Sequence, residues 1–220
     1  SSSSSSSSII FFFIFLSNNP FADLGIVHTI SIGRDYICAI KLDNTVQCKG
    51  ENNYGQSTPP TNLGSVLSIS AGTGHSCAIK SDSTVQCWGN NAYSQSNPPM
   101  DLGPILNISV GEGYTCAIKT DRTLRCWGYD DYGRASPPAD LGPVKSVSTS
   151  SNHTCAIKSD DTVKCWGYNN GGKTETPVNL GAVISISAGG DHTCAIKSDN
   201  TVKCWGENNR GQTTVPIELQ

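Results

Sequence analysis

Apolar and polar residues alternate along three short segments that follow one another in the chain. Val66 to Ala71 alternates apolar with small polar residues, which is typical of a strand. His75 to Lys80 and Thr84 to Trp88 contain β-branched or aromatic residues and predict two further strands. No window of useful length shows the periodicity of a helix. The pattern therefore predicts an all-β protein.

The same pattern returns along the chain with a period of 39 residues. No insertion or deletion interrupts the repeats, which occupy residues 24–62, 63–101, 102–140, 141–179 and 180–218. Two series of cysteines keep the period: Cys38, Cys77, Cys116, Cys155 and Cys194, and Cys48, Cys87, Cys126, Cys165 and Cys204. We therefore divide the chain into a region of five tandem repeats, 18–220, and a distinct leading segment, 1–17.

The two cysteines of each repeat flank a three-residue turn, which is Ser81-Asp82-Ser83 in the second copy. Such hairpin loops need a left-handed third residue, and Asn or Asp occupies that place in three of the five copies. A hairpin centred on Asp82 pairs residues whose numbers add to 164, so Cys77 lies directly opposite Cys87. Opposed residues lie roughly 4.5–5.5 Å apart, which a disulfide tolerates.

We therefore expect one disulfide within each hairpin. Reduced core cysteines, bridges between neighbouring repeats and metal binding are the alternatives. Zinc sites usually contain short Cys-x-x-Cys spacing, which does not occur in this chain, so we predict no metal site at the cysteines.

Each repeat ends in a tail rich in Asn, Gly, Gln and Pro, which predicts a loop with room for a short fourth strand near Gln56. In the third repeat this tail gathers the four candidate binding residues Tyr129, Asp130, Asp131 and Tyr132. Calcium and a protein partner are the ligands that we consider for them. An ordinary solvated loop is the alternative.

Cysteine usage and glycosylation motifs indicate an oxidising compartment. Ten cysteines, an even number, are typical of disulfides in secreted proteins. Asn107-Ile108-Ser109 and Asn152-His153-Thr154 are acceptor motifs for N-linked glycans. We expect Asn152, in a loop, to be more accessible than Asn107, on a strand. The chain is thus predicted to be secreted or extracellular.

Charge and hydropathy exclude two classes of function. The net charge is −3, whereas nucleic-acid binders carry a basic patch. No apolar stretch reaches the roughly 18 residues of a membrane span.

The leading segment has eight serines and then the apolar run Ile9 to Leu16. A signal-peptide remnant, an artefact and a strand that docks on a neighbouring molecule are the three interpretations of this segment.

Nothing in the chain predicts a catalytic site or a cofactor. His75, His153 and His192 occupy one repeat position, where Tyr36 and Tyr114 stand in the other copies, so a structural role is indicated. The Asp of the hairpin turn recurs in every repeat and indicates a turn former rather than a general base. His28 follows no pattern and is expected to be a partly exposed strand residue. No nucleophile elbow, phosphate-binding loop or zinc-protease helix is present.

The repeat resembles that of the regulator of chromosome condensation family. The resemblance rests on Ser70-Ala71-Gly72-Thr73-Gly74-His75-Ser76-Cys77-Ala78-Ile79 with Cys87-Trp88-Gly89, and on the matching residues 187–196 with Cys204-Trp205-Gly206. It implies a seven-bladed β-propeller with about one repeat per blade. The short repeat with two cysteines is similar to the crinkly repeats of plant receptor-kinase ectodomains. This chain departs from that pattern in having five repeats, and in carrying Lys49 where the other repeats carry Trp.

Three functions follow from this resemblance and from the compartment. The first is a non-catalytic extracellular scaffold or protein-interaction module, including a subunit of an extracellular filament. The second is the ligand-binding ectodomain of a receptor kinase, and the third is a secreted enzyme inhibitor. The nuclear role of the family's founder does not suit paired cysteines and sequons. Five blades of a larger ring or array would leave apolar faces for further repeats, a second chain or the Ile9 to Leu16 run to cover.

Overall fold

The computed structural model describes residues 24–219 and consists of five antiparallel sheets of three strands each, in sequence order. The sheets are β1 (Val27–Ile32), β2 (Tyr36–Lys41) and β3 (Val46–Gly50); β4 (Val66–Ala71), β5 (His75–Lys80) and β6 (Val85–Gly89); β7 (Ile105–Val110), β8 (Tyr114–Lys119) and β9 (Leu124–Gly128); β10 (Val144–Thr149), β11 (His153–Lys158) and β12 (Val163–Gly167); and β13 (Val183–Ala188), β14 (His192–Lys197) and β15 (Val202–Gly206). Short 3-10 turns span Asp131–Gly133, Asn170–Gly172 and Ile217–Leu219. The all-β prediction is confirmed, with one sheet in each repeat.

The predicted hairpin register is confirmed in all five sheets. Cys77 pairs with Cys87 across β5 and β6, and the equivalent cysteines pair in the other four hairpins. Each pair forms a disulfide, with Cα atoms 4.0–4.1 Å apart, and the described residues contain no free cysteine. The third turn residue is left-handed in every copy: Asn44, Ser83, Arg122, Asp161 and Asn200.

The aspartate of each turn is a turn former, as predicted. Asp82 Oδ1 accepts hydrogen bonds from the Thr84 backbone N–H at 3.0 Å and from the Thr84 hydroxyl at 2.5 Å. The same pair of bonds occurs in the other four turns. These hydrogen bonds lower the pKa of four turn aspartates below the usual value, and the pKa of Asp199 is lowered mainly by the hydrogen bond from Lys197 and then by those from Thr201.

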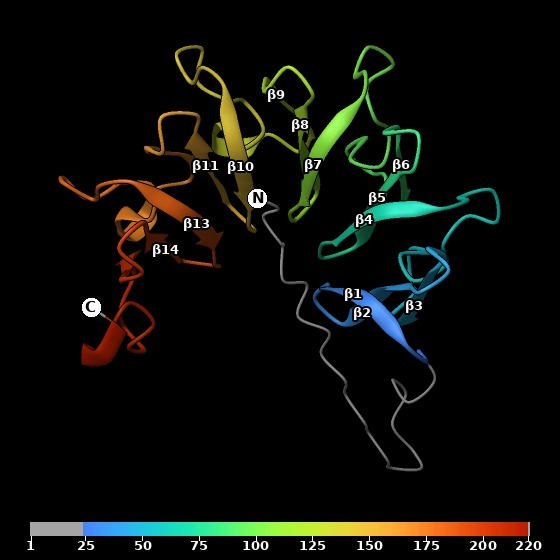
Figure 1. Cartoon of the computed structure of the whole chain (residues 1–220), viewed down its shortest axis with the longest axis horizontal. Helices are drawn as coiled ribbons and strands as arrows, with labels where there is room; N and C mark the ends of the chain where they lie inside the picture. The colour runs from blue at the N-terminus through green and yellow to red at the C-terminus, as the bar shows by residue number, and fades with distance from the viewer. Residues whose placement is uncertain (1–23, 220) are drawn as a thin grey trace, which may run out of the picture.

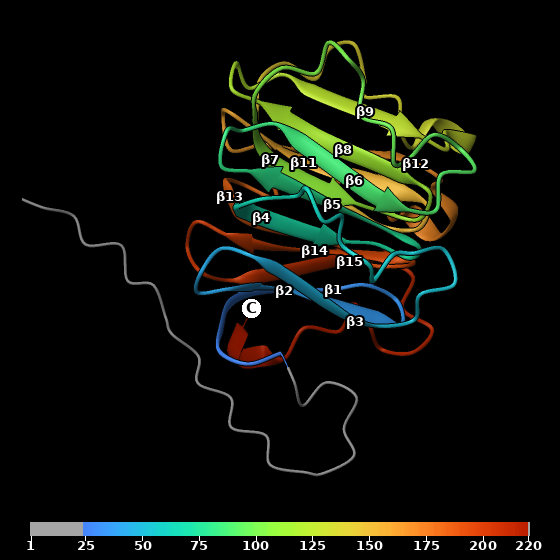
Figure 2. The same cartoon turned by 90° about the vertical axis from the view of Figure 1, so that its right-hand side faces the viewer.

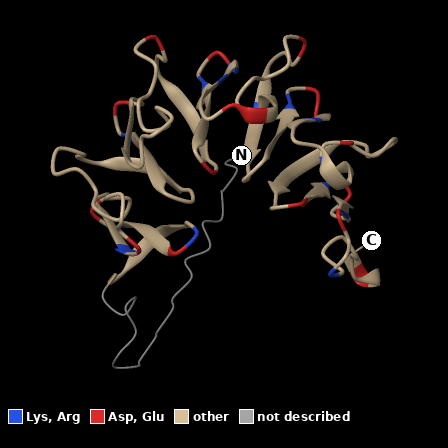
Figure 3. Ribbon diagram, turned by 180° about the vertical axis from the view of Figure 1, so that it is seen from behind, with Lys and Arg blue, Asp and Glu red and all other residues tan. Residues whose placement is uncertain are grey.

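The five sheets stand side by side as the blades of an open arc (Figure 1). The first strand of each blade lies toward the centre of the arc, and the blades of repeats 1 and 5 lie at its two ends (Figures 1 and 2). The links between the first and second strands of all five blades surround a central hollow of about 550 Å³. Among the described residues, Lys, Arg, Asp and Glu lie mainly in loops and at strand ends (Figure 3).

The apolar core lies between the blades rather than within one of them. At the first junction, Ile40 of repeat 1 joins Val66 and Ile69 of repeat 2 in one buried cluster. Equivalent clusters fill the other three junctions. Each blade is therefore stabilised by its neighbours.

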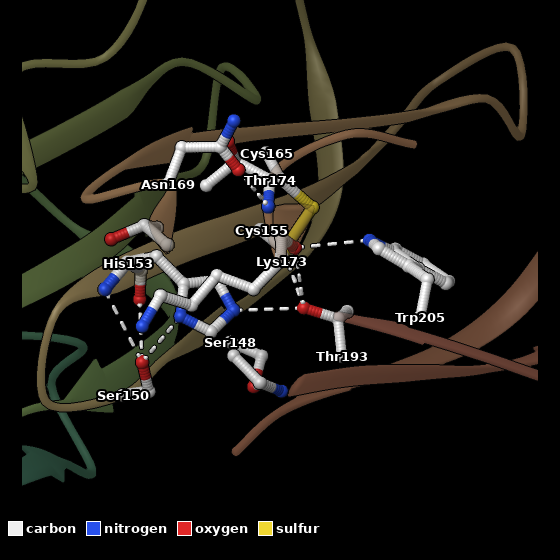
Figure 4. The surroundings of a disulfide bond; sticks show 12 residues. Ser148, Ser150, His153, Cys155, Cys165, Asn169, Lys173, Thr174, Thr193 and Trp205 are labelled. Atoms are coloured by element: carbon white, nitrogen blue, oxygen red, sulfur yellow. Dashed lines mark hydrogen bonds between the residues drawn. A yellow bond between two sulfur atoms is a disulfide. The ribbon is translucent and has the colours of Figure 1, made fainter. Parts of the chain in front are cut away.

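A polar contact, which we term the latch, joins each blade to the tail of the blade before it (Figure 4). At the fourth junction, the Thr193 hydroxyl and the Trp205 indole N–H both donate to the carbonyl oxygen of Lys173, at 3.0 and 2.9 Å. The same pair of donors recurs at the other three junctions: Ser76 and Trp88 on Gln56, Thr115 and Trp127 on Gln95, and Thr154 and Trp166 on Arg134. The latch satisfies a carbonyl that the packed blades exclude from water.

The tail differs from expectation near Gln56. No fourth strand forms in any repeat of the described chain, and the tail instead folds as consecutive turns. Gln56 is fully buried, and its side-chain oxygen accepts the Tyr54 backbone N–H at 2.9 Å. The tail therefore forms this hydrogen bond within its own turn and adds no fourth strand to the edge of the sheet.

Candidate interaction surface

Five tyrosines lie in the tails of repeats 1 to 4, and we term them the tyrosine surface: Tyr54, Tyr93, Tyr129, Tyr132 and Tyr168. Tyr54, Tyr93 and Tyr132 occupy one repeat position and expose 59%, 53% and 66% of their surface. Tyr129 and Tyr168 occupy a second position and are half-buried. The surface is therefore built by homologous loops of successive blades.

The tyrosines contact one another across the boundaries between repeats. Tyr93 of repeat 2 packs on Tyr129 of repeat 3, with ring centroids 4.4 Å apart. Tyr132 of repeat 3 packs on Tyr168 of repeat 4, with centroids 4.5 Å apart. Such tilted aromatic pairs are stabilising beyond their buried area. The tyrosines of repeats 2 to 4 consequently form paired rings rather than isolated side chains.

Two buried cationic side chains, Arg134 and Lys173, contact the half-buried tyrosine rings. The Arg134 guanidinium lies 4.6 Å from the centroid of Tyr129 and donates to the backbone oxygens of Asp131 and Ser151, at 2.9 and 2.7 Å. The Lys173 ammonium lies 5.1 Å from the centroid of Tyr168. Cations in such positions are attracted to the ring faces. The positions of Tyr129 and Tyr168 are therefore stabilised by contacts with buried cations.

Lys173 also forms an ion pair with Asp191 of the next repeat. Its ammonium lies 2.7 Å from the Asp191 carboxylate, and the lysine side chain is fully buried. The hydrogen bond from Lys173 holds the pKa of Asp191 below its usual value. A buried ammonium needs such a partner, so the pair fixes Lys173 beneath Tyr168.

The two predicted acidic ligands make hydrogen bonds within their own loop. Asp130 accepts the Ala135 backbone N–H at 2.7 Å and the Ser136 hydroxyl at 2.5 Å. Asp131 accepts the Tyr129 hydroxyl, which raises the pKa of Tyr129. Within residues 24–219 no group of three or more His, Cys, Asp or Glu side chains could hold a metal ion. The calcium interpretation thus gains no support from the geometry, whereas Tyr129 and Tyr132 do belong to the exposed aromatic surface.

Two of the three histidines at the shared repeat position, His75 and His153, make the contacts between blades that a structural role predicts. His75 and His153 are fully buried, and each Nε2 lies 2.8 Å from a threonine hydroxyl of the next blade, Thr115 and Thr193 respectively. Because each hydroxyl donates its proton to a tail carbonyl, we assign the proton of that contact to Nε2. Burial lowers the pKa of both histidines to about 4. His28 is an exposed residue of β1, 3.3 Å from Asn44 Oδ1, as the sequence predicts.

The two sequons differ from expectation in their accessibility. Asn107 is exposed on β7, next to a shift of register between Ile105 and Asn107. Asn152 lies in the bend before β11 and is only half-exposed, and its backbone oxygen accepts the Tyr168 N–H at 2.9 Å. The order of access that the sequence predicts is therefore reversed.

Residues 24–219 include no helix that is both long and apolar enough to traverse a bilayer.

Comparison with solved structures places these blades among receptor ectodomains and propeller proteins. The CRINKLY ectodomain of the Arabidopsis thaliana receptor kinase ACR4 is similar, with 26% identity, a TM-score of 0.69 and coverage of 81% of this chain and 71% of that one. The ectodomain of the Physcomitrella patens receptor kinase CR4 has 26% identity and a TM-score of 0.69, over 80% of this chain and 52% of that one. Yeast RCC1, solved bound to Kap60, shares the fold alone, at 13% identity and a TM-score of 0.58, over 84% of this chain and 71% of that one.

Comparison of sequences gives the family. No curated protein matches the chain. The family model of the regulator of chromosome condensation (RCC1) repeat matches once in every repeat, at residues 27–56, 66–95, 105–134, 144–173 and 183–212. These matches include all five hairpins and the first turn of each tail, and together they span most of the chain. The chain therefore belongs to the RCC1 repeat family.

Proposed function

We propose that this chain is the non-catalytic, protein-binding part of an extracellular protein, and that it binds its partner through the tyrosine surface. The observation that carries the proposal is that exposed Tyr93 and Tyr132 each pack on a half-buried tyrosine of the next repeat, which in turn contacts buried Arg134 or Lys173. Tyrosine offers a large, amphipathic contact area at low entropic cost, and Asn, Ser and Gly supply adaptable hydrogen bonds. The tails combine these residue types, as in Asn90-Asn91-Ala92-Tyr93-Ser94.

Three observations support the extracellular setting. Each blade carries a disulfide, which is typical of oxidising compartments. Asn107 lies in a sequon and is exposed. Two structural neighbours are ectodomains of receptor kinases. Among the three functions considered from the sequence, these observations favour a receptor-type ligand-binding module over an inhibitor.

The test is an affinity comparison among variants of the full chain. The chain is immobilised, extracellular proteins of the source organism are passed over it, and a retained partner is identified and purified. We then expect Tyr93→Ser with Tyr132→Ser to weaken binding by about 30-fold or more, as central tyrosines do in interfaces. Met100→Ser, a control at an exposed apolar residue outside the surface, should leave the affinity unchanged. Equal affinity of the double variant and the wild type would contradict the proposal.

A further inference from the structure

The outer strand of the third blade, β9, leaves one of its edges unpaired. It pairs only with β8, in an antiparallel register that places Cys126 opposite Cys116. The Lys119 N–H donates to the Thr123 carbonyl at 2.9 Å, so the backbone groups that alternate residues 123, 125 and 127 present are the ones that pair with β8. The N–H and C=O groups of Leu124 and Cys126 therefore point away from β8, and within residues 24–219 no hydrogen bond reaches them.

A groove of about 700 Å³ separates this free edge from the tail of the same repeat, and we term it the β9 groove. Residues 123–126 line one side, and residues 135–139 and 141–143 line the other. The tail side includes three prolines, two alanines and one leucine. Because proline has no N–H, the tail offers few backbone donors to a chain that enters the groove. Such a chain would find its hydrogen-bond partners on β9.

Small side chains keep the groove open in repeat 3. Ala135 stands where the other four repeats carry Ser or Thr, and Ala139 stands where they carry Thr, Met, Val or Ile. In repeats 1 and 2 the serine at the first of these positions donates to a carbonyl of its own tail, as Ser96 does to Asn90 at 2.8 Å. Alanine makes no such bond. The tail of repeat 3 therefore places less side-chain volume beside the edge strand than the other tails do.

Arg125 gives the groove a single charge. Among the described residues that line the groove it is the one charged side chain, and it is exposed. None of the ion pairs of residues 24–219 includes it. Side chains alternate along a strand, so Arg125 lies on the opposite face of β9 from Leu124 and Cys126. A strand added at this edge would be stabilised by an acidic residue opposite Arg125 and by apolar residues on either side of it.

A second copy of this chain is a poor occupant of the groove. Two antiparallel β9 strands use all four free groups only when Leu124 of one copy pairs with Cys126 of the other, and that register sets the two Arg125 side chains opposite each other. Like charges in that position are destabilising. The Ile9 to Leu16 run carries no acidic residue for Arg125. The charge of the groove therefore favours a segment of another protein.

We propose that the β9 groove binds an extended peptide segment of a partner protein, which adds to β9 as an antiparallel strand. Its backbone bonds to the free N–H and C=O groups of Leu124 and Cys126. Its apolar side chains lie on the face of those two residues, and an acidic side chain lies opposite Arg125. Main-chain hydrogen bonds supply affinity in such strand addition, and alternate side chains supply specificity. The groove lies at the outer edge of the blade, apart from the tyrosine surface, and the inference does not rest on the proposed function.

A synthetic peptide added to the full chain tests the proposal. The peptide acetyl-Ser-Val-Glu-Val-Ser-amide can set its valines opposite Leu124 and Cys126 and its glutamate opposite Arg125. Without peptide, the Leu124 and Cys126 amides should exchange rapidly with solvent by NMR, because they have no hydrogen-bond acceptor. Peptide at up to about 5 mM should slow both amides by about fivefold or more, and should leave the Arg125 amide, which already bonds to β8, unchanged. Unchanged exchange at Leu124 and Cys126 overturns the proposal.

Two modified peptides separate backbone pairing from side-chain contact. N-methylation of the first valine removes an N–H that faces β9, whereas N-methylation of the glutamate removes one that faces away from it. We expect the first modification to abolish the protection and the second to retain it. Equal effects of the two modifications overturn the proposed strand addition.

Variants of the chain assign the contact to the groove. Arg125→Glu should weaken binding of the peptide by about fivefold, and a peptide with lysine in place of glutamate should restore it. Ala139→Phe, which fills the groove, should abolish binding, whereas Met100→Phe at the matching position of repeat 2 should leave it unchanged. Equal binding by these two variants overturns the assignment.

The wild-type chain without peptide identifies the other occupants. Sedimentation should show a monomer in which the Leu124 and Cys126 amides exchange rapidly. Slow exchange of both amides in a monomer would show that a segment of the chain itself fills the groove, and slow exchange in a dimer would show that a second copy does. Either result overturns the proposed occupant.

Discussion

Trp88 donates its indole N–H to the carbonyl oxygen of Gln56 in the preceding repeat, at 2.9 Å. The residues are 32 positions apart, and the same contact recurs at all four described junctions. Repeat 1 carries Lys49 at the equivalent position. The bond is therefore a shared feature of the four described junctions, and Lys49 gives repeat 1 no indole with which to make it.

Removal of the indole donor should weaken the junction between repeats 1 and 2. Trp88→Phe keeps an aromatic ring but leaves the Gln56 carbonyl with only the Ser76 hydroxyl at 3.2 Å. We expect a loss of about 1–2 kcal/mol in the free energy of unfolding, measured by denaturant titration. Lys49→Phe, at the matching position without a latch, should change stability by less than about 0.5 kcal/mol. An equal loss in both variants would contradict a specific role for the bond.

The buried histidines should make the fold sensitive to acid. In the folded chain the pKa of His75 and that of His153 are lowered to about 4, whereas an exposed histidine titrates near 6.5. The unfolded state therefore takes up protons first. Their contribution to stability is complete above about pH 6.5 and is lost as the pH falls toward 4, by about 1.4 kcal/mol per pH unit for each histidine. Urea titrations between pH 7 and pH 4 measure this slope, and a pH-independent midpoint would contradict it.

Tyrosine should replace His75 but not His153. In repeats 1 and 3 the equivalent Tyr36 and Tyr114 make the contact to the next blade, and Gly33 and Gly111 leave room for their rings, because a Cβ there would lie 2.3 or 2.6 Å from a ring carbon. Gly72 stands beside His75, whereas Ser150 stands beside His153. We expect His75→Tyr to fold and to reduce the acid sensitivity, and His153→Tyr to be destabilised at neutral pH. Comparable stability of the two variants at pH 7 would count against this steric account.

The five disulfides should differ in their resistance to reduction. In four hairpins at least one cysteine is buried, whereas Cys194 and Cys204 of repeat 5 are both half-exposed on the open end face. Under mild reductant and without denaturant, we expect this pair to be alkylated first. A time course of alkylation followed by peptide mass spectrometry measures the order. Earlier labelling of the buried Cys155–Cys165 pair would show that burial does not control access.

Glycosylation should follow the exposure seen in the structure. Asn107 is exposed beside the shift of register in β7, and Asn152 is half-exposed and beside the Tyr168 backbone. We therefore expect glycan at Asn107 in protein purified from its source, as measured by glycopeptide mass spectrometry. Glycan at Asn152 with none at Asn107 would contradict this order.

The hairpins were predictable because their determinants are local. The turn around Asp82 sets the register, and the register places Cys77 opposite Cys87 without any knowledge of the neighbouring blades. The left-handed turn residue followed equally, although Ser83 and Arg122 show that the turn tolerates residues other than Asn and Asp.

The features that the sequence did not predict depend on contacts between repeats. Tyr93 stacks on Tyr129, and these residues are 36 rather than 39 positions apart, so the period alone does not bring them together. Tyr54 and Tyr93 share a repeat position with Tyr132, so the period does relate these three once Tyr132 is chosen as a candidate. The tail at Gln56 suggested a strand, yet its side chain closes a turn. Asn152 lies in a loop as predicted, yet the Tyr168 N–H of the following tail donates to its backbone oxygen and the residue is only half-exposed, which the sequence did not reveal.

Hydrogen exchange of the complex with the identified partner tests the central claim most directly. A chain that binds through the tyrosine surface should show partner-dependent protection of the tail amides of repeats 2 to 4, at residues 90–97, 129–136 and 168–175. The hairpin turns and the links around the central hollow should exchange as in the free chain. Protection confined to those turns or links, with unchanged exchange in the three tails, would contradict binding through the tyrosine surface.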